Sequence, residues 1–552
     1  MTGVQTCALP ISNDELIEMM GESVLKVSKF THSYPHCWRS HTPLIFRATK
    51  QWFISVDGTP KGEDKTLRGI ALDEVEKTLF FPESGKNRLR SMVENRPDWC
   101  ISRQRDWGVP IAFFRVKATG EVLLDEKVLN FVAMIFEMHG SDAWYSMPTE
   151  QLLYPGSGYK ADELEKVTDI LDVWFDSGST WYSVLKSRNY DAGEYQADLY
   201  LEGSDQHRGW FQSSMFLSTA VEHKAPYKMV LTHGFTVDEK GEKMSKSKGN
   251  VVAPDAVLKE YGSEILRLWV ASSDYQGDLK ISQNILKQSA ENYRKLRNTF
   301  RIMLANINDL KAITPYNEMG ELDKWILSEA KTVLDAVYKS FSNYNFVHGM
   351  SMLNNFIVNE LSGIYIDITK DSLYCDAIND PRRTSSQSAM AIMTKSLLTL
   401  IAPILTYTAD EIVEHLPAVI KGEKEDVFDF VHEDIEGIVS TFDAAYMNSA
   451  REKFFEIVDG LKKEKIIKNT LELVIVTESE KIAKMDKTAA EDWFVVSGIS
   501  HTQIIEELGK FEVNGDIFVI QKATKAKCPR CWKYQSIDEE HTCERCSKVL
   551  NA

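Results

Sequence analysis

The sequence predicts an α/β domain built on a parallel sheet, followed by an all-helical bundle and a small C-terminal metal-binding ribbon. Strand-like runs at 170–175, 199–202 and 228–231 alternate with a helical run at 210–223, which is the order of a parallel sheet with crossover helices. From 256 to about 416, apolar residues recur at every third or fourth position, as the buried faces of bundled helices require. The last 25 residues hold four of the eight cysteines, in two C-x-x-C pairs.

The length and composition indicate a multidomain protein of ordinary globular type. A chain of 552 residues exceeds what one hydrophobic core supports, so three or four domains are expected. With 43% hydrophobic and 26% charged residues, no window approaches the roughly 18 consecutive apolar residues of a membrane span. The net charge of −17 excludes a uniformly basic surface, although an acidic protein can still bind nucleic acid through a local basic patch.

The cysteine distribution and the first residues bear on the compartment. Four cysteines are scattered and four are clustered, so no disulfide framework is predicted and a reducing compartment, the cytoplasm, is expected. Residues 1–11 lack the basic and apolar stretches of a signal peptide and join no pattern downstream. We interpret them as foreign sequence and leave them out of the fold prediction.

A lysine-rich loop follows the strand-like run at 228–231 and a glycine-containing turn at 238–241. It reads K-M-S-K-S-K-G-N from 243 to 250, and its polar members are Lys243, Ser245, Lys246, Ser247 and Lys248. Three cations and two hydroxyl groups on a loop suit the neutralisation of a polyphosphate as charge shifts during nucleotidyl transfer. A solvated lysine turn is the alternative, which the position directly after a strand disfavours.

A second constellation lies where the run at 199–202 ends and the helix at 210–223 begins. The carboxylate of Glu202, then Gly203 and a polar turn, stand where an open parallel sheet presents ligand-binding groups. Glu202 could bind an ammonium group or a ribose hydroxyl, and Trp210 could wall an apolar pocket. The alternative is that Ser204 and Asp205 only cap the helix and Trp210 belongs to the core; the residues alone leave both open. The apolar run at 170–175 and the turn after it, taken alone, predict no more than a buried strand.

The C-terminal cysteines predict a metal site. Two C-x-x-C pairs separated by 11 residues can close a tetrahedral Zn²⁺ site, and chance or redox pairing is the weaker alternative. Residues 522–552 carry seven Lys or Arg against four Asp or Glu. Together with Trp532 and Tyr534 this balance suits contact with RNA, while a purely structural ribbon remains a competitor. The four predicted ligands are Cys528, Cys531, Cys543 and Cys546.

Several of these motifs resemble those of one enzyme family. The pentapeptide at 243–247 is similar to the KMSKS signature of class I aminoacyl-tRNA synthetases, and the segment at 201–211 resembles their adenylate-binding segment. The resemblance implies that Lys243 and Lys246 act in catalysis and that Lys246, Ser245 and Ser247 bind ATP, which enters with Mg²⁺. It further implies that the aminoacyl-adenylate is held by Glu202, Gly203, Asp205 and Gln206, and that the amino-acid side chain lies between Trp174 and Trp210.

Motifs in the C-terminal half resemble one particular group of class I synthetases. The letters L-Y-C-D at 373–376 and the terminal cysteine pairs are similar to bacterial-type isoleucyl-tRNA synthetases. This resemblance implies ATP-dependent activation of isoleucine, transfer to tRNA(Ile), and a monomer. One alternative is a valyl- or leucyl-tRNA synthetase, which the terminal cysteines and the pair of Trp174 and Trp210 disfavour. The other alternative is a truncated tRNA-binding module. The arginines between 96 and 105 and the basic residues between 451 and 468 are either structural or face RNA phosphate.

The resemblance also predicts the domain boundaries and what the chain lacks. No His-x-Gly-His occurs, and the threonine-rich and Gly-His-Gly-x-Asp-Asp segments of an editing pocket are missing. The catalytic domain is therefore expected to be incomplete, and the chain alone is expected to form no isoleucyl-adenylate. The predicted boundaries are 1–11 for foreign sequence, 12–60 for a remnant of the editing insertion, 61–255 for the partial catalytic domain with the lysine-rich loop, 256–315 for a helical stem-contact region, 316–420 for the anticodon-binding bundle, 421–521 for a mixed α/β junction and 522–552 for the zinc module.

Overall fold

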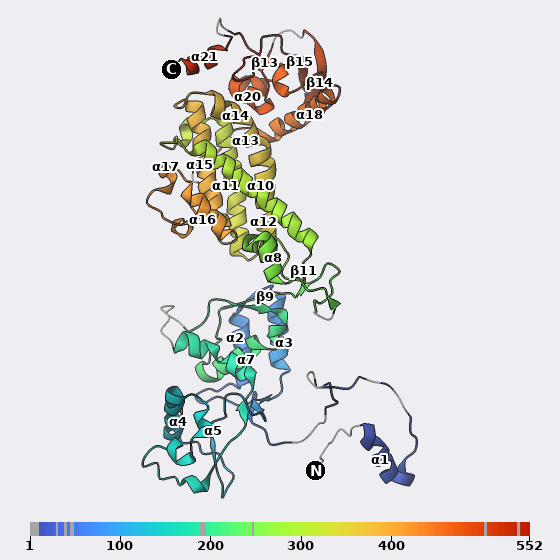
Figure 1. The fold of residues 1–552 in the computed structure, drawn as a ribbon, viewed down its shortest axis with the longest axis vertical. Helices are drawn as coiled ribbons and strands as arrows, with labels where there is room; N and C mark the ends of the chain where they lie inside the picture. The colour runs from blue at the N-terminus through green and yellow to red at the C-terminus, as the bar shows by residue number, and fades with distance from the viewer. Residues whose placement is uncertain are drawn as a thin grey trace. The chain divides into compact units, whose positions relative to one another are not determined.

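A computed structural model describes most of the chain and divides it into two compact units. The described residues are 10–28, 31, 33–37, 41–44, 49–187, 195–245, 248–433, 435, 437–501, 505–537 and 541–551. Unit 1 is Met1–His233 and unit 2 is Gly234–Ala552 (Figure 1). Among the described residues, no helix is long and apolar enough to cross a membrane.

Unit 1 contains the predicted parallel sheet. Its strand order is β2 (Leu79–Phe81), β9 (Met229–His233) and β8 (Tyr200–Gly203), and both pairings are parallel. The helices α2 (Leu67–Lys77), α3 (Ser84–Glu94) and α7 (Trp210–Glu222) pack their apolar sides around it. The strands predicted at 199–202 and 228–231 and the helix predicted at 210–223 are confirmed. The buried side chains of this core include Val75, Leu89, Phe211, Phe216, Tyr227 and Val230.

The strand predicted at 170–175 is wrong beyond its first two residues. Strand β7 (Ile170–Leu171) pairs antiparallel with β4 (Ser102–Arg103), outside the parallel sheet. The helix α6 (Val173–Gly178) then begins, because the side chain of Asp172 accepts a hydrogen bond from the backbone N–H of Trp174 at 3.4 Å. An aspartate in this position is a strong helix N-cap, and the apolar run alone did not reveal it.

The remaining elements of unit 1 form a smaller satellite. Antiparallel strands β5 (Phe114–Val116) and β6 (Leu164–Lys166) pack with α4 (Glu126–His139) around the fully buried Trp144. The side chain of Asp125 caps α4 by accepting hydrogen bonds from the backbone N–H groups of Lys127 and Val128. The unit also contains α1 (Pro10–Met20), α5 (Ala143–Ser146) and the antiparallel pair β1 (Phe53–Ile54) and β3 (Trp99–Cys100).

Unit 2 contains a pair of short strands and the predicted helical bundle. Strand β10 (Thr236–Val237) pairs parallel with β11 (Leu279–Lys280). Helix α15 ends at Ile401, two residues before Pro403, because a proline inside a helix removes a backbone hydrogen bond and clashes with the preceding turn. The helices are α8 (Pro254–Tyr261), α9 (Ser263–Ala271), α10 (Gln283–Ile307), α11 (Glu321–Ser342), α12 (Phe346–Asn355), the π-helix η8 (Phe356–Tyr365), α13 (Ile366–Ile368), α14 (Lys370–Cys375), α15 (Pro381–Ile401), α16 (Thr406–Glu414) and α17 (Ala418–Lys421).

The C-terminal part of unit 2 is a mixed α/β region that shares a core with the bundle. Its sheet has the order β13-β12-β15-β14, and the indole of Trp493 meets that of Trp325 in α11 with ring centroids 4.9 Å apart. Unit 2 begins at Gly234, so the lysine-rich loop lies in the same unit as the bundle. The elements are α18 (Ala444–Lys463), β12 (Leu473–Thr477), α19 (Glu480–Lys484), α20 (Lys487–Phe494), β13 (Gly498–Ser500), β14 (Glu507–Val513), β15 (Asp516–Lys522) and α21 (Glu544–Leu550).

Candidate functional site

The turn between β8 and α7 is organised by one side chain. Gln206, in the short 3-10 turn η5 (Ser204–His207), accepts a hydrogen bond from the backbone N–H of Trp210 at 3.0 Å and donates to the Asp205 carboxylate at 3.2 Å. Gln206 therefore caps the first turn of α7. The alternative in which Ser204 and Asp205 cap this helix is wrong, because α7 begins only at Trp210 with Gly209 as its N-cap residue, and both residues lie in the separate turn η5.

Both predicted pocket tryptophans flank this turn. A Cβ atom on Gly209 would lie 2.5 Å from the side-chain oxygen of Gln206 and 2.9 Å from the ring of Trp174, so only glycine fits there. The indole of Trp210 donates to the carbonyl of Ser177 at 2.8 Å and stacks on Tyr200 with centroids 4.0 Å apart. Trp210 thus belongs partly to the core, while Trp174 is 40% exposed.

The environment fixes the orientation of the Trp210 ring. Burial raises the pKa of Tyr200 to about 12, so the ring beneath Trp210 stays uncharged at neutral pH. Helix α6 approaches α7 closely at Gly178, where a Cβ atom would lie 2.9 Å from the backbone of Ser213. This approach brings the Ser177 carbonyl within reach of Trp210.

The carboxylates of the segment lie at the C-terminal edge of the sheet. Glu202 is exposed, and its backbone pairs with Thr232 of β9. A Cβ atom on Gly203 would lie 2.7 Å from a carboxylate oxygen of Asp205, so the aspartate folds back over the glycine. The structure therefore brings together Trp174, Gly203, Asp205, Gln206 and Trp210, with Glu202 beside them on β8.

The lysine-rich loop is closed at its base by an asparagine. The side-chain oxygen of Asn250 accepts from the backbone N–H of Ser245 at 2.9 Å, and its amide group donates to Asp238 at 2.8 Å. This bond from Asn250, with backbone N–H donors of Glu242 and Lys240, holds the pKa of Asp238 below its usual value. The turn at 238–241 is therefore joined directly to the far end of the loop.

The arm that carries the loop is fixed to neighbouring backbone within unit 2. A Cβ atom on Gly234 would overlap the carbonyl of Gly277, so the two backbones meet where only glycine is tolerated. The N–H of Phe235 donates to Asp278 at 2.9 Å, and the strand pair β10–β11 follows. The described part of the loop thus has a base that these contacts fix.

The described lysines of the loop are exposed, and they differ in whether they form an ion pair. Lys243 is exposed, and Lys248 is exposed and pairs with Glu242 at 3.2 Å. Lys246 and Ser247 lie outside the residues that the structure describes. A pair between two side chains that are each 56% exposed is weak, so Lys248 can exchange its partner at little cost.

The four C-terminal cysteines come together as predicted. Their sulfur atoms lie within 4.8 Å of one another, all four side chains are buried, and the sulfurs of Cys531 and Cys543 are 3.8 Å apart. Tetrahedral Zn–S bonds of about 2.3 Å separate sulfurs by about 3.8 Å. Burial alone would raise the pKa of Cys528, yet backbone N–H donors from Cys531, Cys543 and Arg530 lower it to about 6. This cluster can therefore hold a metal ion.

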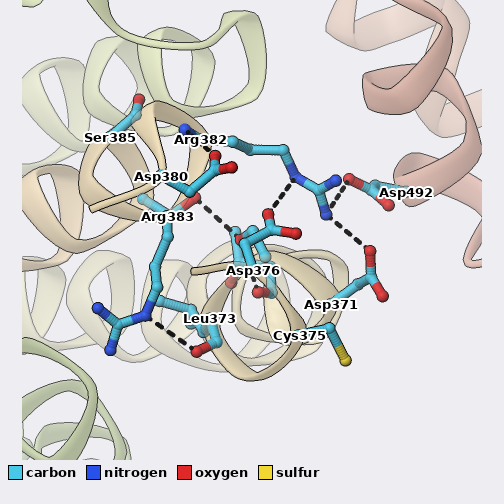
Figure 2. A network of polar contacts seen from close by, with 12 residues as sticks. Asp371, Leu373, Cys375, Asp376, Asp380, Arg382, Arg383, Ser385 and Asp492 are labelled. Atoms are coloured by element: carbon cyan, nitrogen blue, oxygen red, sulfur yellow. Dashed lines mark hydrogen bonds and ion pairs between the residues drawn. The ribbon is translucent and has the colours of Figure 1, made fainter. Parts of the chain in front are cut away.

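The cysteine module is docked on α14 by a network that the sequence did not predict. Arg545 pairs with Asp371 at 2.8 Å and with Asp376 at 3.1 Å. Lys533, which is buried, pairs with Asp492 of α20 at 3.1 Å. Arg382 pairs with Asp371, Asp376 and Asp492 at 2.8, 3.5 and 3.2 Å, and Figure 2 shows these three contacts. Three cations thus join α14, α15, α20 and the cysteine module.

Asp371 carries the anionic charge at the centre of the network. Burial alone would raise the pKa of Asp371, but the hydrogen bond from Arg545 and the charges of Lys533, Arg545 and Arg382 outweigh it and hold that pKa well below its usual range. Burial instead raises the pKa of Asp376 and of Asp492.

Several basic residues that could have contacted RNA instead bind groups within the protein. Arg530 donates to the carbonyl of Cys375, and Cys375 packs in one buried cluster with the four metal-site cysteines. Lys533 and Arg545 bind the carboxylates above, and the buried Arg451 donates to the carbonyl of Trp493. The cysteine module keeps exposed Lys522, Lys525, Lys527 and Lys548, and Trp532 is 59% exposed with Lys527 over its ring at 5.5 Å.

Family models match two long stretches of the chain. Residues 5–282 match the model for tRNA synthetases class I (I, L, M and V), and residues 323–477 match the anticodon-binding domain of tRNA ligase. The first match covers half of the chain. The chain belongs to the class I tRNA synthetases. The part of this synthetase chain that matches the first model includes both the turn at Gln206 and the loop closed by Asn250. The part that matches the second model includes the L-Y-C-D segment.

Relatives of this synthetase chain are closely similar along nearly its whole length. The isoleucine–tRNA ligase of Sulfurimonas denitrificans is 86% identical over 541 residues, which are 98% of this chain and 59% of that protein. The isoleucine–tRNA ligase of a Nitratiruptor species is 67% identical over 540 residues, with the same coverage. The chain therefore spans about three-fifths of the length of these relatives. A solved methionyl-tRNA synthetase of Mycobacterium tuberculosis, in complex with methionyl-adenylate, superimposes with a TM-score of 0.49 and 18% identity over 70% of this chain and 68% of that one.

Proposed function

We propose that this chain is the larger part of an isoleucine–tRNA ligase, which activates isoleucine with ATP and transfers it to tRNA(Ile). The observation that carries the proposal is the 86% identity to such a ligase over 98% of the chain. The match to an anticodon-binding domain supports tRNA as the partner. Trp174 and Trp210 beside the turn at Gln206, together with the lysine-rich loop, supply the chemistry that this reaction needs.

The activation step assigns roles to the loop. The isoleucine carboxylate attacks the α-phosphorus of ATP, the bond from that phosphorus to the bridging oxygen breaks, and pyrophosphate leaves with the negative charge. Lys243 and Lys246 neutralise the charge that develops on the leaving group, and Ser245 and Ser247 donate hydrogen bonds to phosphate oxygens. Mg²⁺ accompanies ATP as part of the substrate.

The turn at the sheet edge holds the product of that step. Glu202, Gly203, Asp205 and Gln206 bind the aminoacyl-adenylate, and Trp174 and Trp210 contact the aliphatic side chain. An apolar pocket of this kind distinguishes isoleucine from valine by about 1–3 kcal/mol, so it favours isoleucine without excluding valine.

The C-terminal cysteines are proposed to bind Zn²⁺ structurally. Four buried thiols at tetrahedral spacing, with backbone N–H groups donating to sulfur, are the donor set that zinc prefers in closed sites. Bound zinc would replace the four thiol protons and hold the module in the form that docks on α14. A monomer in the cytoplasm stays our prediction for the intact protein.

Two other functions fit parts of the sequence. A valyl- or leucyl-tRNA ligase is disfavoured because the relatives of highest identity given above are isoleucine–tRNA ligases. A module that only binds tRNA would retain the bundle and the cysteine module without catalysis. Charging assays separate all three.

The test uses a full-length chimera in which this chain replaces the residues that it matches in the Sulfurimonas denitrificans ligase. The chimera is expected to attach radiolabelled isoleucine to a tRNA(Ile) transcript at a rate similar to that of the unmodified ligase, and not to charge tRNA(Val) or tRNA(Leu) transcripts. Charging of either other transcript would contradict the assignment, and tRNA(Ile) binding without charging would favour the binding module.

A further inference from the structure

Unit 1 has a basic pocket apart from the turn at Gln206. It has a volume of about 490 Å³ and lies between α3, the residues after it, and the junction of η5 with α7. Three arginines line it, and none of the described lining residues is acidic, in a chain whose net charge is −17. The lining residues are Arg88, Ser91, Met92, Asn95, Arg96, Pro97, Arg208 and Gln212.

The close packing of η5 on α3 creates this concentration of charge. A Cβ atom on Gly85 would lie 3.0 Å from the ring nitrogen Nε2 of the buried His207, so α3 and η5 meet at a glycine. Arg88 lies one turn further along α3, and Arg208 directly follows His207. The two exposed arginines thus flank the same opening, together with Ser91 and Asn95 on the same face of α3.

The pocket arginines are not needed to satisfy the end of α3. Basic residues near a helix C-terminus often serve only its free carbonyls. Here, Gln212 donates to the Met92 carbonyl at 2.8 Å, and Arg68 donates to the Val93 and Glu94 carbonyls at 2.7 and 3.0 Å. Those carbonyls therefore already accept hydrogen bonds from side chains other than the three pocket arginines.

The three arginines also have no ion-pair partner in the described part of the chain. Arg96 donates to the side-chain oxygen of Gln212, and its guanidinium lies over the ring of Trp99 at 5.3 Å. Its Nε atom is buried and has no hydrogen-bond acceptor among the described residues. Burial and the nearby Arg208 lower the pKa of Arg96, against the charge of Asp172. A guanidinium remains protonated at neutral pH, so an anion bound beside Arg96 would supply the acceptor and the charge that its described contacts leave incomplete.

We propose that Arg88, Arg96 and Arg208 form a binding site for a phosphate group. Guanidinium groups match phosphate oxygens in geometry and charge, and the Ser91 hydroxyl and Asn95 amide add neutral donors. The group can belong to the backbone of a bound RNA or to a free phosphate or pyrophosphate, because both present the same oxygens. The site goes beyond the proposed function, since it lies outside the residues assigned to ATP, isoleucine or the metal.

The experiment measures binding of defined probes to the 552-residue chain. Inorganic phosphate and pyrophosphate are titrated calorimetrically, and a labelled 12-base-pair RNA duplex is followed by anisotropy at several salt concentrations. The test variant is Arg88→Gln with Arg208→Gln, since both side chains are exposed and their loss should leave the fold intact. Arg96→Lys keeps a charge but loses the planar fork. Arg90→Gln is the matched control, because Arg90 lies on the same helix and pairs with Glu76 and Glu94.

The expected result is a loss of about tenfold in affinity for each arginine removed, and so about a hundredfold in the double variant. Arg96→Lys should weaken binding, and Arg90→Gln should change it less than twofold. A loss confined to phosphate and pyrophosphate identifies a free anion. A loss of RNA affinity identifies the RNA backbone as the ligand. In that case the slope of log affinity against log salt concentration should also become shallower, by the contribution of about two phosphate contacts. Equal affinities of wild type and double variant for all three probes, or no saturable binding, would overturn the proposal. The charging of tRNA(Ile) by the chimera is decided separately.

Discussion

Replacing Lys246 by alanine in the chimera should reduce isoleucine-dependent ATP–pyrophosphate exchange by about a hundredfold to a thousandfold. The reason is that a preorganised cation facing a developing charge contributes this much to catalysis. The described part of the loop supports such preorganisation, since Asn250 joins Ser245 to Asp238 and closes its base. The reduction should appear mainly in kcat, because the charge on the leaving group grows in the transition state.

Lys240→Ala is the matched control for this prediction. Lys240 lies in the exposed turn before the loop, and its backbone N–H donates to Asp238 at 3.0 Å, a bond that alanine retains. The control should keep exchange within about twofold of the unmodified chimera. A loss below about threefold for Lys246→Ala would mean that the lysine does not face the phosphates.

Replacing Asp371 by asparagine should undock the cysteine module from α14. The substitution keeps the shape but removes the anion that faces Arg545, Arg382 and Lys533. Breaking a buried ion-pair network at one partner costs about 3–5 kcal/mol, which corresponds to a hundredfold or more in an opening equilibrium. Amide hydrogen exchange in the peptide spanning 527–551 of the whole chain should accelerate by that factor at pH 7.

The pH dependence of this effect has a definite sign. The pKa of Asp371 is lowered in the folded protein, so its contribution is present above the unfolded value of about 3.9 and is lost as the pH falls through the folded value. The exchange rates of wild type and Asp371→Asn should therefore converge only below about pH 4. Asp335→Asn, which removes a half-buried pair with Lys331 at 3.0 Å within one helix, should change local exchange less than threefold. Equal protection of wild type and Asp371→Asn at pH 7 would contradict the docking role.

Local patterns in the sequence were sufficient for most of the fold. Alternating strand and helix runs predicted the order of β8, α7 and β9, and three-and-four spacing predicted the bundle, because both signals depend on residues close in sequence. The run at 170–175 failed because its apolar letters suit a strand and a short helix equally. The decisive feature was the capping aspartate at 172, which outweighed the β-branched and aromatic residues after it.

The parts of the candidate site that escaped prediction depend on contacts between distant segments. In the sequence, Gln206 is one of several polar residues in a turn. Only the structure shows that its side chain accepts a hydrogen bond from the first N–H group of α7. The docking network joins Asp371, Arg382, Asp492 and Arg545 across 174 positions of sequence, and a single sequence does not indicate such pairs. A weak signal was present in the density of charged residues around the buried Cys375.

The most direct measurement for the central claim is ATP–pyrophosphate exchange by the chimera with isoleucine, valine and leucine in parallel. The proposed pocket predicts the highest kcat/KM for isoleucine, a value about 10–200-fold lower for valine, and no exchange above background for leucine. A preference for valine or leucine, or no exchange with isoleucine, would contradict it.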